Sequence, residues 1–164
     1  MKKIRVYLDS CILISFFSKS EKEKKNKKVV EAIIEKIGEL KAVETCISPW
    51  VIAETVNILI NNHNMSNKQV WDIESSLINK KRFGKLKIKI LNPKNDSQED
   101  YDFEEFFHDI RETNLKYHPG LADAMHIVIM KNNDVAYVLT FNPDDFKKVE
   151  GLIVVPLEEF LPAK

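Results

Sequence analysis

Short apolar runs that favour β-strands alternate with segments of helical periodicity along most of this sequence. The strand-like runs cover residues 4–8, 42–47, 86–90, 136–140 and 151–156, and apolar residues recur at helical spacing between them. Such alternation favours parallel strands joined by helical crossovers that cover both faces of the sheet. We therefore expect an α/β fold, a three-layer α/β/α sandwich with a mainly parallel central sheet. The length of 164 residues predicts a single domain over residues 1–164.

Composition excludes several classes of protein. With 44% hydrophobic and 30% charged residues the chain is globular rather than disordered or fibrous, and its 25 basic and 25 acidic residues cancel. No run of about 18 apolar residues occurs, so no membrane span is expected. Cys11 and Cys46 stand in apolar surroundings and are predicted to be reduced thiols, because a secreted disulfide scaffold uses more cysteines. The expected location is the cytoplasm.

The first strand-like run ends on a carboxylate. Asp9 follows Ile4–Leu8 where the pattern changes from strand to helix, which places it at the carboxyl edge of the sheet. Open α/β sheets bind their ligands at that edge. An aspartate here can also serve only as the N-cap of the following helix, so Asp9 alone decides nothing.

Two further acids stand alone in helices that are otherwise apolar. Glu54 lies one turn into a helix that begins at Ser48-Pro49, and Asp123 lies in the first turn of a helix that begins near Leu121. A buried carboxylate must reach water, a basic partner or a cation. The sequence around Glu54 does not decide between these three outcomes. Asp123 could be there simply because the helix dipole stabilises an anion in the first turn. His126 could be a metal ligand or a hydrogen-bonded core histidine.

These acids are expected to meet at one edge of the sheet. Strand carboxyl ends and the helix starts that follow them share that edge in a parallel sheet, and a polar segment from Asn142 to Asp145 follows another strand. Clustered carboxylates repel one another unless a cation binds, and hard oxygen ligands favour Mg²⁺ or Mn²⁺. Such ions suit phosphodiester chemistry, which predicts a metal-dependent nuclease or phosphatase.

At these residues the chain resembles the PIN-domain ribonucleases, particularly the VapC-type toxins of toxin-antitoxin pairs. The resemblance covers nearly the whole chain and rests on four motifs in order. They are Leu8-Asp9-Ser10, Trp50-Val51-Ile52-Ala53-Glu54, Ala122-Asp123-Ala124-Met125-His126, and Leu139-Thr140-Phe141-Asn142 followed by Asp145-Phe146.

The resemblance implies roles for the residues in these motifs. Asp9 and Asp123 would ligate the metal, Glu54 would assist directly or through water, and Asn142 would be the fourth catalytic position. Ser10 and Thr140 would orient ligands or water. Family members often have Asp where Asn142 stands, which leaves one or two metals open, and Asp144 or Asp145 could compensate. Cys11 replaces a residue that is commonly polar.

The resemblance also implies a substrate and partners. The chain would cleave RNA with a metal-activated water, would be inhibited by a small antitoxin protein, and would form a homodimer. The lysines of residues 22–28 and 80–89 could contact phosphates. They could equally be solvated helix turns and an edge strand that resists aggregation.

The acidic stretch from Asp96 to Glu112 also contains apolar residues at helical spacing. Phe103, Phe106, Phe107 and Ile110 predict a buried stripe, with most of the acids on its wet face.

Other functions remain to be distinguished. A PIN-like RNA-binding or scaffold protein without turnover would use the same acids only as helix caps. A phosphohydrolase of the haloacid dehalogenase type needs a second Asp two residues after the nucleophile, where Cys11 stands. A response-regulator receiver gives Glu54 and Asp123 no role.

Overall fold

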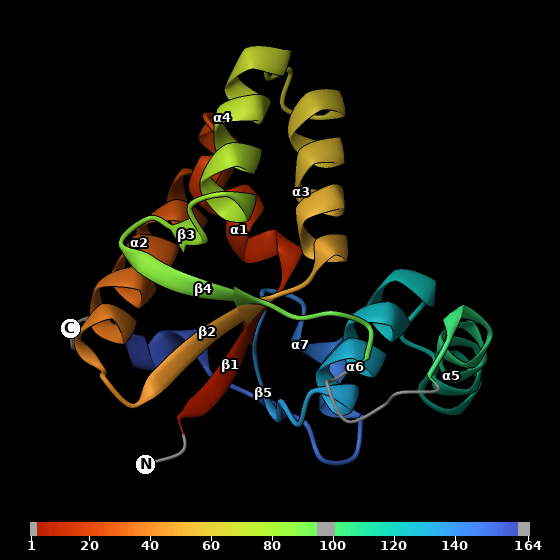
Figure 1. Ribbon diagram of the computed structural model, residues 1–164. Helices are drawn as coiled ribbons and strands as arrows, with labels where there is room; N and C mark the ends of the chain where they lie inside the picture. Colours follow the sequence, from red (N-terminus) through yellow and green to blue (C-terminus); the bar gives the residue numbers. More distant parts are fainter. Residues whose placement is uncertain (1–2, 95–100, 161–164) are drawn as a thin grey trace.

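A single six-stranded sheet organises the part of the chain that this computed structural model describes, residues 3–94 and 101–160 (Figure 1). The strand order is β3-β4-β2-β1-β5-β6, and every neighbouring pair is parallel except β3 and β4. The strands are β1 (Ile4–Leu8), β2 (Val43–Ile47), β3 (Arg82–Phe83), β4 (Leu86–Ile90), β5 (Tyr137–Leu139) and β6 (Ile153–Val154). The expected mainly parallel sheet is confirmed.

The helices form two groups. The first comprises α1 (Ser10–Phe17), α2 (Lys24–Glu39), α3 (Pro49–Asn61) and α4 (Asn67–Ile78), and the second α5 (Phe103–Tyr117), α6 (Leu121–Asn132) and α7 (Pro143–Lys147). Short 3₁₀ turns lie at η1 (Glu21–Glu23) and η2 (Leu157–Phe160). Helix α1 packs on α2 and α3, α3 packs on α4, and α6 packs on α5 and α7 (Figure 1).

The path of the chain explains the two groups. From β1 it steps to β2 and then β4, whereas β5 lies on the opposite side of β1. Because parallel crossovers are right-handed, this reversal places the two groups of helices on opposite faces and completes the α/β/α sandwich. In open α/β sheets, ligands bind in a crevice outside the strand carboxyl ends at such a reversal; here that region lies at the carboxyl ends of β1 and β5, and we call it the crevice.

Local sequence signals set where the helices near this crevice begin. The Asp9 side chain accepts a hydrogen bond from Ser10 N and caps α1, and Ser48 caps α3, with Pro49 as its first residue. Between α5 and α6, His118 adopts a left-handed conformation and Gly120 has a φ of 94°, a value that glycine adopts readily. This break places Asp123 in the first turn of α6.

The basic strand agrees with its pattern but not with its predicted place. Leu86 and Ile88 are buried and Lys87 and Lys89 are exposed, as alternation requires. Strand β4 is second from the edge, however, because the two-residue strand β3 pairs with it. The edge-strand explanation of these lysines is therefore wrong.

The buried stripe predicted for α5 is half wrong. Phe106 and Ile110 are buried, but Phe103 is 74% exposed and Phe107 57% exposed, with their rings stacked on each other. The main neighbour of α5 is the single helix α6, which covers a stripe narrower than the apolar pattern. The acids of residues 96–100 lie outside the described residues.

Two smaller expectations are also tested. Cys11 and Cys46 are free thiols, as predicted. No helix within residues 3–94 and 101–160 is long and apolar enough to span a membrane.

Candidate metal centre

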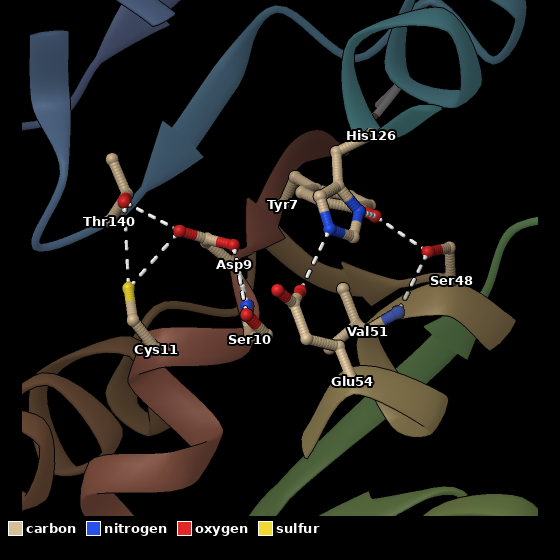
Figure 2. A network of polar contacts seen from close by, with 9 residues as sticks. All are labelled: Tyr7, Asp9, Ser10, Cys11, Ser48, Val51, Glu54, His126 and Thr140. Carbon is tan, nitrogen blue, oxygen red and sulfur yellow. Dashed lines mark hydrogen bonds and ion pairs between the residues drawn. The ribbon is translucent and has the colours of Figure 1, made fainter. Parts of the chain in front are cut away.

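The candidate site lies in the crevice between the carboxyl ends of β1 and β5. Asp9 follows β1 and Thr140 follows β5, while Glu54 reaches in from α3 and His126 from α6 (Figure 2). The sheet and both helix layers therefore contribute side chains to one place.

Asp9 is the most enclosed acid of the site. It is 3% exposed, and Oδ1 accepts a 2.7 Å hydrogen bond from Ser10 N. Oδ2 accepts hydrogen bonds from Thr140 Oγ1 at 2.6 Å and from Cys11 Sγ at 3.1 Å. Donors from both sides thus orient the carboxylate, which caps α1 and also faces the crevice.

Glu54 has found a basic partner, one of the three outcomes that its sequence context left open. Its Oε2 atom lies 3.3 Å from His126 Nε2. The hydrogen bond from His126 holds the pKa of Glu54 below its ordinary value, against a smaller opposing effect of burial. Glu54 is therefore ionised at neutral pH.

His126 belongs to a buried network. Its Nδ1 atom lies 2.9 Å from the Tyr7 hydroxyl, which lies 2.7 Å from Ser48 Oγ. Ser48 Oγ in turn accepts a hydrogen bond from Val51 N at 3.3 Å, in the first turn of α3 (Figure 2). The interpretation of His126 as a hydrogen-bonded core histidine is correct, although its Nε2 atom faces the site.

Asp123 is half-buried beside the other acids and holds its proton more tightly than an ordinary aspartate does. Burial, and then the charges of Asp9 and Asp145, raise the pKa of this half-buried carboxyl from 3.8 to about 6. The nearby His126 opposes this shift in part. A bound cation would favour the ionised form of Asp123 and so offset this shift.

The donor set fits a divalent cation. Asp9, Glu54 and His126 each offer one ligand atom, and these atoms lie within 4.8 Å of one another. The two carboxylates of this set suit Mg²⁺ or Mn²⁺. Asp123 is outside this closest group but is coupled to it through charge.

Only some of the site residues predicted in the segment after β5 interact with the acids of the centre. Thr140 contacts Asp9 as expected, whereas the Asn142 side chain is exposed and only its backbone N–H bonds to Thr140 Oγ1, at 2.9 Å. Asp145 is half-buried and acts on Asp123, while Asp144 is exposed and pairs with Lys147 at 3.8 Å. Of the two acids, Asp145 is the one that faces the site.

The structure also assigns contacts to residues whose part in the site was not predicted. Tyr7 was treated only as part of a strand, Ser48 only as a helix cap and Cys11 only as a departure from the family. A hydroxyl within the buried half of β1, two residues before Asp9, was the available signal for Tyr7. The burial of Cys11 beside Asp9 raises the pKa of its thiol, which keeps it a hydrogen-bond donor.

One group of lysines lies apart from this centre. Lys3, Lys41, Lys85, Lys87 and Lys89 line a separate open cleft. Lys3, Lys41 and Lys85 precede β1, β2 and β4, so the cleft lies toward the amino ends of the strands, away from Asp9.

Comparisons with known proteins agree with this arrangement. The chain is similar in fold to PAE2754 from Pyrobaculum aerophilum, for which a crystal structure is known. The TM-score is 0.53 and the identity 13%, over 96% of this chain and 95% of that one. No curated protein matches the sequence. The model of the PIN domain matches residues 6–152. This chain therefore belongs to the PIN-domain family, whose members are generally nucleases.

Proposed function

We propose that this chain is a Mg²⁺- or Mn²⁺-dependent endoribonuclease. The observation that carries the proposal is the closeness of the Asp9 and Glu54 carboxylates in the crevice, with Asp123 coupled to them through charge. A divalent cation held by Asp9 and Glu54, with Asp123 beside it, would supply an activated water and neutralise charge on the phosphate.

The residues around the cation would have separate tasks. Thr140 and Cys11 donate hydrogen bonds to Asp9 Oδ2, so the Asp9 carboxylate keeps one orientation. His126 keeps Glu54 ionised. Cation binding would favour the charged form of Asp123, which supplies further negative charge at the crevice.

Hydrolysis of single-stranded RNA with Mn²⁺ tests this proposal. The wild type should cleave, and Asp9→Asn and Asp123→Asn should each abolish cleavage, as should EDTA. Asp134→Asn is the matched control, because Asp134 is exposed and follows the far end of α6. Cleavage that survives both site substitutions, or that survives EDTA, would contradict the mechanism.

A non-catalytic PIN-like RNA-binding or scaffold protein is the second candidate. It is favoured by the partners that the acids already have: Asp9 caps α1 and Glu54 contacts His126. Calorimetry with Mn²⁺ discriminates the two, because a metal centre should bind the ion and gain thermal stability, and helix caps should do neither.

We further propose that the chain is the toxin of a VapBC-type pair, dimeric and cytoplasmic, and inhibited by a small antitoxin. The support is the set of four motifs shared with that family. The neighbouring reading frame should then encode a small DNA-binding protein that co-purifies with this chain and stops RNA cleavage. A neighbour that neither binds nor inhibits would argue against this role.

A further inference from the structure

We infer that Ser48, Tyr7 and His126 form a directional hydrogen-bonded chain that fixes His126 as its Nε2–H tautomer and so positions the Glu54 carboxylate. His126 is then a positioning residue and not a ligand of the cation. The contribution of His126 to RNA cleavage rests on the proposed nuclease function. The assignment of its tautomer does not depend on that function.

Burial makes the chain independent of solvent. Tyr7 and Ser48 are 0% exposed and His126 is 1% exposed. Their three polar contacts, at 2.7, 2.9 and 3.3 Å, run from Ser48 through Tyr7 and His126 to Glu54 (Figure 2). Only Glu54, at the end of the chain, is partly open to water, with 36% of its side chain exposed.

The two ends of the chain fix its direction. An ionised Glu54 carboxylate only accepts hydrogen bonds, so His126 Nε2 must carry the hydrogen that joins them. At the other end, the Ser48 hydroxyl donates to Tyr7, so the Tyr7 hydroxyl must donate to His126 Nδ1; Nδ1 therefore carries no hydrogen and the imidazole is neutral. Ser48 Oγ already accepts from Val51 N, which leaves its hydrogen free to donate.

The opposite direction leaves atoms unsatisfied. If Tyr7 donated to Ser48, the Ser48 hydroxyl hydrogen would have no acceptor among the residues that the structure describes. Neutral His126 would then donate from Nδ1 to Tyr7, and its bare Nε2 atom would face the Glu54 carboxylate at 3.3 Å. Two acceptors at that distance repel each other, so this arrangement is disfavoured.

The tautomer decides between two roles for His126. A nitrogen must present its lone pair to bind a metal, and the Nε2–H tautomer has none at the atom that faces the site. Its hydrogen instead fixes the Oε2 atom of Glu54. Partners of this kind orient the ligands of metal sites and affect metal affinity or activity.

Long-range ¹H–¹⁵N correlation spectra of the imidazoles test the inference on the unmodified protein. We expect a protonated Nε2 and an unprotonated, hydrogen-bond-accepting Nδ1 for His126. Both assignments should persist when Mg²⁺ alone is added. A proton on Nδ1 with a bare Nε2, or the loss of the Nε2 proton on addition of Mg²⁺, would overturn the inference.

Tyr7→Phe tests the chain itself, because it removes one hydroxyl and keeps the ring. We expect His126 to lose its single tautomer and kcat with Mn²⁺ to fall roughly 10- to 100-fold, with KM for RNA unchanged. Tyr137→Phe on the neighbouring strand β5 is the matched control and should leave both readouts unchanged. A wild-type kcat in Tyr7→Phe would overturn the positioning role. If the wild type cleaves no RNA, the nuclease proposal fails while the spectra still decide the tautomer.

Discussion

Asp123→Asn should stabilise the metal-free protein while it destroys the proposed centre. The pKa of Asp123 rises from 3.8 to about 6 on folding, because of burial and the charges of Asp9 and Asp145. The folded state therefore holds this proton more tightly than the unfolded chain does. Stability accordingly falls as pH rises from about 3.8 to about 6, and stays lower above pH 6. Asparagine removes that loss.

The size of the effect follows from three contributions. Full conversion of the pKa change gives about 3 kcal/mol. Water screens a half-buried side chain, which reduces this figure. The N-terminus of α6 favours an anion by about 0.3–1 kcal/mol, which acts in the opposite direction. We expect a net gain of about 1 kcal/mol at pH 7.5, or roughly 2–4 °C in Tm for a chain of this length.

Urea unfolding at pH 7.5 and at pH 4.5, with and without Mn²⁺, measures this effect. Without metal the variant should be the more stable protein at pH 7.5, and its advantage should shrink at pH 4.5. With Mn²⁺ at about 100 times its Kd the wild type should gain about 2.7 kcal/mol and become the more stable one. Asp134→Asn should differ from wild type by less than about 0.5 kcal/mol at either pH. A variant less stable than wild type without metal at pH 7.5, or an equal advantage at both pH values, would refute the reasoning.

Further substitutions test particular residues of the centre and the core. Thr140→Val removes the 2.6 Å hydrogen bond to buried Asp9 and should cost about 1.5–3 kcal/mol in urea unfolding. Thr140→Ser keeps the hydroxyl and should lower the free energy of unfolding by less than Thr140→Val does. Equal losses in the two variants would mean that the hydrogen bond to Asp9 contributes nothing to stability. Asn142→Asp restores the acid common in the family and should lower the Kd for Mn²⁺ in calorimetry, and an unchanged Kd would exclude position 142 from the centre. Phe106→Ala should cost about 3–5 kcal/mol because Phe106 is buried, whereas Phe107→Ala should cost less than about 1 kcal/mol. Similar losses would mean that both rings are in the core.

Much of the fold could be predicted because its signals are local. Alternating apolar runs indicated the parallel sheet, and Ser48-Pro49 marked the start of α3. The position of Asp9 at the end of a strand likewise follows from the sequence alone. Each of these depends on residues within a few positions of one another, where backbone preferences and periodicity decide the outcome.

The errors arose where the width or the phase of an element depends on its neighbours. The pattern of α5 shows which residues are apolar but not how much of the helix α6 covers, so Phe103 and Phe107 were wrongly placed in the core. In the short helix α7, the adjacent residues Asp144 and Asp145 lie on different sides of the helix: Asp145 acts on Asp123, and Asp144 is exposed. No periodicity can be measured over five residues.

The least predictable part of the centre is also the most buried. Tyr7 and His126 are 119 positions apart in the sequence, and they meet only because α6 returns across the face of β1. Their contact depends on the crossover and on the register of β1 beneath α6, and neither leaves a local mark in the sequence. A tyrosine in an apolar strand and a histidine in an apolar helix each look like ordinary core residues.

The topology of the sheet explains why acids can gather at this place at all. Asp9 comes from the sheet, Glu54 from the helices on one face, and Asp123 from those on the other. These three layers approach each other at the carboxyl ends of β1 and β5, where the strand order reverses and a crevice opens. Elsewhere in the sandwich the sheet separates the two helix layers. Because no two of these acids belong to the same element, their repulsion is imposed only when the whole sandwich forms. Cation binding should therefore stabilise the entire fold rather than one local segment.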